Sequence, residues 1–492
     1  MNIKSIKKWH VFLLWPALIA CCIYVVSAFT HPLMAWTGPQ AKVMFAPTLT
    51  LKPNQFEHIS EIIQDSHLHQ VKMAKLVPFQ DEVLLQITHD NLSPRRYFST
   101  LSKQELINHD QEQAIWLAQH YLKQDLPIKN IEFINQFSQS YPAVNRLLPV
   151  YKLNFDTQDD LSVYIHTDTQ ALASIENNWK RSLRFVFQTF HSFNWLNNYE
   201  LLRLVLISFL VSTLLIISMT GLLYLIKLKR KHSITDIRRR WHRRLGWIVV
   251  APLFLFSLSG LYHLWQASLV SAPMGMQLTQ SLDLSQWPKN KHTVLPENIN
   301  INQVSLIQIY TEEYGDTQHL YRLSISKIQS EQDQSLNKNT RHKRFDGQAK
   351  EKSALYIDAN SGELLPDLDQ TLILQQAKKH LGADDTHDLP RTFITHFGLG
   401  YDFRNKRLPV WRVEGNNGVH VFIDPITHIL VDQNNTSGRL EGYSFSFLHK
   451  WNMLTPILGR FNRDMLILFT LGLIFLLTAF GLWMRLKTNL KH

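Results

Sequence analysis

Four long apolar runs constrain the fold of this 492-residue chain more than any other feature. The runs are Val11–Thr30, Leu204–Ile226, Leu245–Ala267 and Met465–Met484. Each has about 20 residues or more without a Lys, Arg, Asp or Glu. A helix of that length crosses a hydrocarbon core about 30 Å thick. We therefore predict a membrane α-helical protein with four transmembrane helices.

Basic residues predict how these helices are oriented. The segment Lys227–Arg244 holds nine Lys or Arg residues and one acid, Asp236. Further basic residues precede the first run and follow the last: Lys4, Lys7, Lys8, Arg485, Lys487 and Lys491. Because positively charged loops stay in the cytoplasm, we expect both termini to be cytoplasmic, in a bacterial inner (cytoplasmic) membrane. The net charge of +11 then reflects topology, and we expect the lipid bilayer, not nucleic acid, as a partner.

The runs and the charges divide the chain into seven expected parts. These are a first transmembrane helix (1–31), a first periplasmic lobe (32–200), a second helix (201–227), a cytoplasmic basic loop (228–244), a third helix (245–267), a second periplasmic lobe (268–464), and a fourth helix with a cytoplasmic tail (465–492). Within the second lobe, the polar stretch Gln329–Lys352 has few apolar residues. We expect this stretch to be a loop or a partly disordered insert.

The second half of the chain repeats motifs of the first half. The repeated motifs are Tyr141-x3-Asn145-x2-Leu148-Pro149-Val150-Tyr151 with Tyr401-x3-Asn405-x2-Leu408-Pro409-Val410-Trp411, and Gly221-Leu222 with Gly481-Leu482. A tandem duplication with two helices per half keeps the same orientation in each copy. We therefore predict a four-helix transmembrane bundle with a pseudo-twofold axis along the membrane normal and two periplasmic α+β lobes.

Residue periodicity predicts the secondary structure of the lobes. Apolar residues at helical spacing favour helices at Gln111–Lys123 and Thr371–Leu381. Alternating apolar residues favour strands, which we expect at Val150–Phe155, Leu161–His166, Val410–Val413, Val419–Asp424 and Ala354–Asp358. The first four of these strands are expected to form two hairpins.

Six histidines occupy repeated positions at the ends of the apolar runs. They are His10, His31, His191, His242, His263 and His449. His10 precedes His31 by 21 residues, as His242 precedes His263, so each helix offers an imidazole at both membrane faces on roughly the same side. Imidazoles from neighbouring helices can bind haem iron from both sides. We predict one or more haem b groups whose iron is bound through these histidines, and the alternative is that they only anchor the helices at the interface.

We expect two levels of histidine ligands. His10 and His242 should meet near the inner membrane face, and the other four should lie near the outer face. Four outer imidazoles suffice for two haems, or for one haem with two supporting groups. The number of haems and the pairing of their axial ligands stay open at this point.

Three motifs resemble one known family. Arg240–Trp247 resembles the H-R-x-L-G entry to a membrane helix in the PepSY-associated transmembrane family, and Phe447–Trp451 resembles the Leu-His-[Arg/Lys] before that family's last helix. Tyr356–Glu363 resembles the PepSY strand and turn, Y-x-D-x-x-[ST]-G. The first half departs, because Trp9-His10-Val11 lacks the Arg-x-Leu-Gly and no equally clear PepSY turn is found there. The family includes iron-regulated inner-membrane proteins and ferric-siderophore reductases that bind haem, which implies PepSY-like lobes and a redox role.

The resulting hypothesis is an inner-membrane b-type haem protein that carries electrons across the membrane. Its acceptor would be periplasmic, and the resemblance implies ferric iron in a siderophore during iron uptake. The predicted cytoplasmic pieces are too short for a flavin or nicotinamide domain, so the donor would be a cytoplasmic reductase or a membrane quinol. The alternative is a non-enzymatic PepSY regulator or sensor that binds a peptide or protein partner. No catalytic side chain can be named from the sequence.

Overall fold

The computed structural model describes residues 3–489, with gaps at 44, 50, 52–53, 228–235, 270–277, 279–280, 290–294, 296–299, 312–315, 327–350, 352, 383–387, 399 and 417. The chain forms two compact units. Met1–Gly38, Asn178–Ser271 and Ser437–His492 make a helical unit, and Pro39–Asn177 with Ala272–Thr436 make a β-sheet unit. Each unit therefore takes segments from both halves of the sequence.

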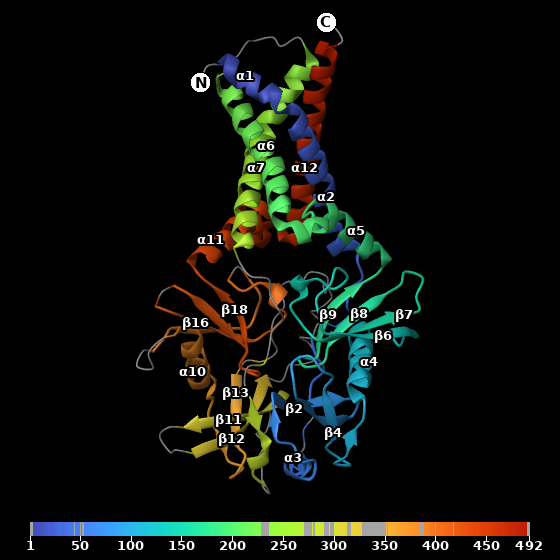
Figure 1. Cartoon of the computed structure of the whole chain (residues 1–492), viewed down its shortest axis with the longest axis vertical. Helices are drawn as coiled ribbons and strands as arrows, with labels where there is room; N and C mark the ends of the chain where they lie inside the picture. Colours follow the sequence, from blue (N-terminus) through green and yellow to red (C-terminus); the bar gives the residue numbers. More distant parts are fainter. Residues whose placement is uncertain are drawn as a thin grey trace. The chain divides into compact units, whose positions relative to one another are not determined.

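Four long helices build the helical unit (Figure 1). They are α2 (Leu14–Thr37), α6 (Glu200–Lys227), α7 (Ile237–Ser268) and α12 (Thr455–Asn489). All four are long and apolar enough to cross a membrane, which confirms the four predicted helices. Each contacts two others in the closed order α2, α6, α7, α12, and Ala20, Val249 and Ile474 are buried between them.

Two helix boundaries at one end of the bundle differ from the expected ones. A short helix α1 (Ile3–Phe12) precedes α2 and is separated from it at Leu13. Pro16 has no N–H to donate to the Phe12 carbonyl, which accounts for this break. α7 begins at Ile237, inside the segment expected to be a loop, because the Asp236 side chain accepts the Arg238 N–H and caps the helix. α1 and the C-terminal end of α12 lie at the same end of the bundle (Figure 1).

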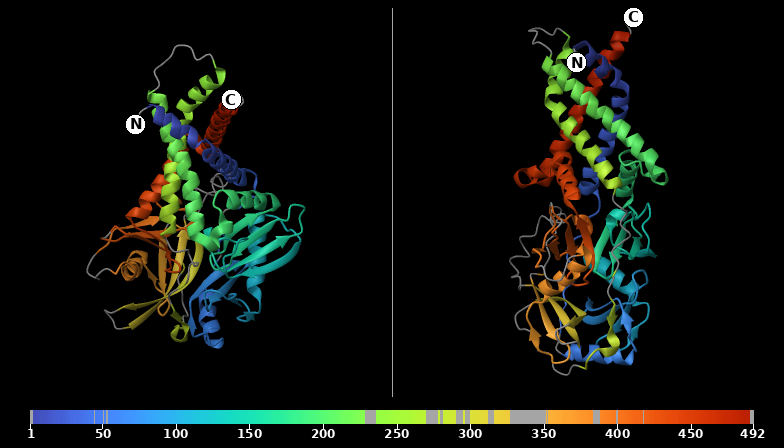
Figure 2. Two further views of the ribbon diagram at one scale, coloured as in Figure 1. Left: turned by 45° about the horizontal axis from the view of Figure 1, so that its top comes forward. Right: turned by 60° about the vertical axis from the view of Figure 1, so that its left-hand side comes forward.

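Shorter helices at the other end of the bundle were expected to belong to the lobes but belong to the helical unit. They are α5 (Asn178–Phe190), η2 (Asn194–Tyr199), α11 (Thr436–Ser444), the π-helical turn η5 (Phe445–His449) and η6 (Asn452–Leu454). α5 contacts α2, and η5 contacts α7. These segments are short and polar on one side, so sequence hydropathy does not separate them from the lobes. In Figures 1 and 2, α5 and α11 flank the bundle on opposite sides.

An eight-stranded antiparallel sheet runs through the β-sheet unit in the order β14-β13-β12-β11-β2-β3-β4-β5. Its strands are β2 (Met73–Phe79), β3 (Glu82–Thr88), β4 (Arg96–Ser99), β5 (Glu105–Leu106), β11 (Asn300–Thr311), β12 (Asp316–Ser326), β13 (Ser353–Asp358) and β14 (Leu364–Leu365). β2 and β11 join the halves, with Leu76 opposite Val304 and Lys75 opposite Ser305. α3 (Asn54–Asp65) packs on this sheet through Phe56, and β1 (Gln70–Val71) pairs with β10 (Leu282–Asp283) near η3 (Leu284–Gln286). The two expected lobes therefore share one sheet.

Two four-stranded sheets complete the unit, and both have the same strand order. One contains β6 (Ile128–Ile134), β7 (Val150–Phe155), β8 (Ser162–His166) and β9 (Ala171–Glu176); the other contains β15 (Arg391–Ile394), β16 (Val410–Glu414), β17 (His420–Ile423) and β18 (Leu430–Asn434). α4 (His109–Leu122) packs on the first sheet and α10 (Asp369–Leu381) on the second, with Ala118 and Ala377 buried at the contacts. Both predicted helices and both predicted hairpins are thereby confirmed.

The polar stretch Gln329–Lys352 lies outside the described residues except for Glu351. Glu351 is 4% exposed and accepts a hydrogen bond from Arg322. At least this end of the stretch is therefore part of the folded core, because a buried guanidinium requires carboxylate partners.

Candidate functional site

The structure brings His10 and His242 together inside the helical unit. His10 lies on α1 and His242 on α7, and their ring centroids are 6.5 Å apart with planes inclined by 72°. Two imidazoles that bind one metal from opposite sides, each with a bond of about 2 Å, have ring centres roughly 6 Å apart. The separation of this inner pair (His10 and His242) fits two axial ligands of one iron.

Hydrogen bonds leave the same ring nitrogen of each histidine available. The Nδ1 of His242 donates to the Leu477 carbonyl at 3.1 Å. The Nδ1 of His10 lies 3.2 Å from the Thr220 hydroxyl oxygen, and that hydroxyl donates to the Ile216 carbonyl. These partners assign the proton of each neutral ring to Nδ1. The Nε2 atoms are then unprotonated, as metal binding requires.

Two glycines of the repeated Gly-Leu motif make room for these rings. A Cβ atom on Gly221 would lie 3.3 Å from Cε1 of His10. A Cβ atom on Gly481 would lie 3.3 Å from Cε1 of His242. Any larger residue would press on the imidazole and rotate it, so the repeated glycines hold space for the repeated histidines.

His191 and His449 are held by two serines in the same way. The Nδ1 of His191 lies 3.1 Å from the Ser27 hydroxyl, and the Nδ1 of His449 lies 3.3 Å from the Ser259 hydroxyl. Each serine hydroxyl also donates to a backbone carbonyl of its own helix, so it accepts from the ring N–H. Ser27 and Ser259 each follow the inner histidine of their half by 17 residues. The two serines were not predicted from the sequence, although their equal spacing is visible in it.

A phenylalanine lies beside both outer histidines of each half. Phe187 stacks on His191 at 4.6 Å and contacts His31 at 5.8 Å. Phe445 stacks on His449 at 4.8 Å and on His263 at 4.0 Å. His449 also lies within electrostatic range of His191 and His263, as His31 does of His449. The four imidazoles, here called the outer cluster (His31, His191, His263 and His449), therefore occupy one region of the bundle.

The two halves of the outer cluster are not identical. The Nδ1 of His263 makes a short contact with a carboxylate oxygen of Glu441. Glu441 lies eight residues before His449, and the residue eight positions before His191 is Leu183. One outer imidazole thus has an acidic partner that the repeated position cannot supply.

These sites consist of pairs, which limits the metals they can hold. Within the described part of the chain, no three His, Cys, Asp or Glu side chains are grouped closely enough to bind a metal ion. A bare ion usually takes at least three protein ligands, whereas haem iron needs only its axial ligands from the protein. None of the six histidines is classed as buried, so each residue keeps some accessible surface. The arrangement fits haem better than a bare metal ion.

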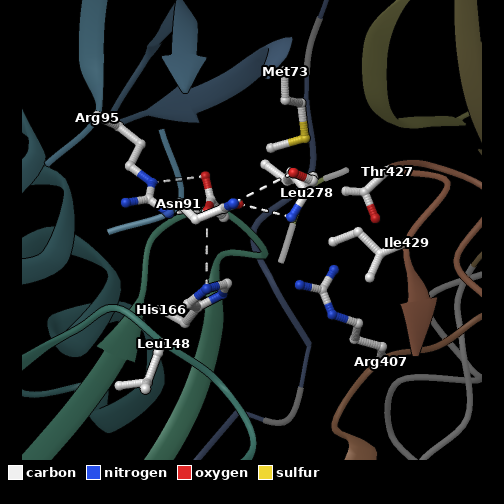
Figure 3. Close-up of a pocket in the computed structure, with 10 residues that line it drawn as sticks. Met73, Asn91, Arg95, Leu148, His166, Leu278, Arg407, Thr427 and Ile429 are labelled. Atoms are coloured by element: carbon white, nitrogen blue, oxygen red, sulfur yellow. Dashed lines mark hydrogen bonds and ion pairs between the residues drawn. The ribbon is translucent and has the colours of Figure 1, made fainter. Parts of the chain in front are cut away.

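The β-sheet unit contains a second polar site, a small cavity of about 10 Å³. Figure 3 shows Arg95, His166 and Arg407 converging on it. Burial opposes ionisation of Asp168, but the Arg95 guanidinium beside it holds the pKa of this carboxyl far below its usual range. Burial and the surrounding cations lower the pKa of His166 to about 3. Burial also lowers the pKa of Lys75 to about 8, although Asp168 opposes the shift.

Two hydrogen bonds outside this cavity join the two halves of the unit. The Lys406 ammonium donates to the Asn145 side chain at 3.0 Å, and Arg146 donates in turn to the Asn405 side chain. The contact is reciprocal, because residues at repeated positions exchange partners. The cavity holds at most about one water molecule, so we assign it a structural role.

A Tyr–Asp hydrogen bond with the same sequence spacing is found in both halves. Tyr356 donates to Asp369 at 2.6 Å, and Tyr97 donates to Asp110 at 2.8 Å. Each tyrosine precedes its aspartate by 13 residues. The expected strand and turn at Tyr356 are confirmed as β13 and a turn in which Gly362 has φ 77°. The sequence analysis missed the first-half counterpart at Tyr97, because no Gly follows it at that spacing.

Comparison with known proteins gives one family. The model of the family described as the PepSY-associated TM region matches residues 11–487. The comparison with curated proteins finds none that matches this chain. The family match includes α2, α6, α7, all but the last two residues of α12 and the whole β-sheet unit, and the expected resemblance is thereby confirmed. The chain belongs to the PepSY-associated transmembrane family.

Proposed function

We propose that this chain is an inner-membrane b-type haem protein that carries electrons to a periplasmic acceptor. The observation that carries the proposal is the inner pair, whose ring separation of 6.5 Å suits two axial ligands. When bound there, haem would supply one-electron transfer. The protein supplies the axial imidazoles, fixes their tautomers through Thr220 and the Leu477 carbonyl, and leaves room for the rings at two glycines.

We further propose that the outer cluster holds at least one more haem, with His191 and His449 as its axial ligands. Both rings are held through Nδ1 by a serine, which leaves both Nε2 atoms available. Ser259 and His242 lie on the same helix α7, and 17 residues of helix span about 26 Å. That distance is long for a single electron-transfer step, so electrons entering at the inner pair need a second site.

The orientation follows from the charges and the repeat. The basic residues at the start of α7 and at the end of α12 would face the cytoplasm with both termini, and the β-sheet unit would lie in the periplasm. We propose a tandem duplication related by a pseudo-twofold axis along the membrane normal. The common strand order of the two small sheets supports it, as do the repeated Ser–His contacts and the reciprocal Asn145 and Asn405 contacts.

The acceptor that we propose is ferric iron in a siderophore, as the family resemblance implies. One electron converts Fe³⁺ to Fe²⁺, and hard oxygen donors hold the less charged ion less tightly. A cytoplasmic reductase or a membrane quinol would provide the electron. The siderophore would then release its iron without being chemically altered.

Spectroscopy and reoxidation together test this proposal. The purified protein should give a reduced-minus-oxidised spectrum of b-type haem with imidazole ligands. After reduction by dithionite and removal of the excess, the protein should be reoxidised by a ferric siderophore but not by its gallium analogue, which accepts no electron. A protein without haem would contradict the proposal and favour a regulator or sensor. A haem protein that no ferric chelate reoxidises would contradict the reductase assignment alone.

A further inference from the structure

Two arginines occupy repeated positions at the start of the second long helix of each half. Arg203 on α6 precedes Gly221 by 18 residues, and Arg463 on α12 precedes Gly481 by 18 residues. These are the glycines beside the inner pair. Eighteen residues make five helical turns, or about 27 Å, so each arginine lies at the end of its helix away from the inner pair.

Arg463 is held in a fixed position, and it is only 8% exposed. It donates to the Asp464 carboxylate through Nε at 3.0 Å and through a terminal nitrogen, to the Thr455 hydroxyl at 3.0 Å, and to the Asn452 side chain. Asp464 is also shared with Arg460 at 3.9 Å. Two guanidinium groups thus lie near a single carboxylate, so the positive charge here exceeds the charge of Asp464.

These cations lie beside the outer cluster. Trp36 packs on Phe461 with ring centroids 4.9 Å apart, which places the end of α2 that carries His31 against this part of α12. The side chains of Lys450, Arg460 and Arg463 all lie within electrostatic range of His31. Lys450 also lies 4.7 Å from the ring of Phe445, the residue that stacks on two outer histidines.

Arg203 is the counterpart of Arg463 in the other half of the chain. Its Nε is buried and makes no hydrogen bond to the described residues. Its ion pair with Glu200 is long, at 3.8 Å. A buried guanidinium nitrogen without an acceptor is costly, and a planar carboxylate is the partner that a guanidinium binds best.

We propose that Arg463, supported by Lys450 and Arg460, binds the propionate carboxylates of a haem held at the outer cluster. Arg203, which belongs to the other half of the chain, binds the same carboxylates. The inference rests on the proposed function, because it requires a haem at that level. Haem has two propionates on one edge, so carboxylate anchors fix the rotation of the macrocycle as well as its affinity. Phosphate headgroups of lipids share this chemistry and are the competing source of the anion.

The test compares haem with its dimethyl ester, which has no carboxylates. Arg463→Gln should release haem at least about tenfold faster than the parent, with apomyoglobin as the acceptor, and Arg463→Lys should recover part of the difference. Arg203→Gln should show a smaller effect in the same direction. With the dimethyl ester, the parent and Arg463→Gln should release at equal rates. Arg181→Gln, a substitution on α5, is the control and should match the parent with both ligands.

The outcomes separate the two proposals. A parent protein that binds no haem overturns the proposed function and this inference together. The second outcome needs a parent that binds haem. If the ratio of the release rates of haem and its dimethyl ester is then the same in Arg463→Gln as in the parent, only the carboxylate anchor is overturned. An effect of Arg463→Gln that is seen in phosphatidylglycerol nanodiscs and lost in phosphatidylcholine nanodiscs assigns the cations to lipid phosphate instead. The circular dichroism of each variant checks that the bundle is folded.

Discussion

The inner pair and the outer cluster use the same type of side chain in different surroundings. The inner pair is nearly symmetric, with one histidine, one hydrogen-bond acceptor for Nδ1 and one glycine from each half. The outer cluster is asymmetric, because Glu441 pairs with His263 and three cations lie near His31. Under the proposed function, a site that only passes electrons can remain symmetric, whereas a site that meets a particular acceptor or fixes one cofactor orientation gains from asymmetry. We therefore propose that the outer cluster is the specialised end of the molecule.

The largest expected effect comes from an outer ligand. His449→Ala should remove the haem signal of the outer site and abolish reoxidation by a ferric siderophore, because iron would lose an axial imidazole. His69→Ala, in the β-sheet unit, is the control and should retain both properties. The measurement is the haem-to-protein ratio together with the reoxidation trace. Full siderophore reduction by His449→Ala would remove the proposed role of the outer cluster.

Loss of an inner ligand should affect the inner and the outer haem differently. His242→Ala should remove the inner haem and slow electron entry from a quinol or reductase by about tenfold or more. The outer haem should remain reducible by dithionite, since a small reductant reaches it without the inner site. If His242→Ala and His449→Ala gave identical spectra and kinetics, the two-level account would be wrong.

A smaller effect should follow from the glycine that makes room for His242. In Gly481→Ala the new methyl would lie 3.3 Å from the imidazole, and overpacking of this kind costs about 1–3 kcal/mol. We expect a displaced ring, visible as an altered low-spin EPR signal and partial loss of inner haem. Gly472→Ala lies on the same helix with no atom within 4 Å of the added methyl and should leave the EPR spectrum unchanged.

Glu441→Leu tests the asymmetry of the outer cluster. It places a leucine at the position that corresponds to Leu183 in the first half. We expect haem to remain bound and the potential of the outer site to rise modestly, because a negative charge beside His263 favours the oxidised form. A spectroelectrochemical titration measures the shift. An unchanged potential would show that Glu441 does not act on the outer site.

The smallest predicted effect concerns acid stability of the β-sheet unit. Burial lowers the pKa of His166 to about 3 and that of His428 to about 4, from 6.5. The unfolded chain therefore binds more protons than the folded one below pH 6.5, so stability falls as the pH is lowered from 6.5 toward 3. Hydrogen exchange in β8 and β17, corrected for intrinsic rates, should show this loss of protection. His166→Gln should flatten the pH dependence, and an unchanged slope would contradict the assignment.

Sequence reasoning located what depends on local pattern. The four long helices, α4, α10 and both hairpins follow from periodicity and apolar length, and the histidines were visible from their repeated spacing. The shared eight-stranded sheet was not predictable, because the pairing of β2 with β11 joins residues more than 200 positions apart. Ser27 and Thr220 look like ordinary helix residues until the histidine that each one contacts is known. Glu351 was assigned to a solvated insert because its neighbours are polar, although Arg322 draws it into the core.

The central claim is that paired histidines from the two halves bind haem iron at two levels. The most direct test is the pyridine haemochrome ratio of haem to protein in two double variants and their combination. His10→Ala with His242→Ala should remove one share of the haem, and His191→Ala with His449→Ala should remove the other. The combined variant, folded by circular dichroism, should contain none. A folded combined variant that keeps the haem content and difference spectrum of the parent would contradict the account.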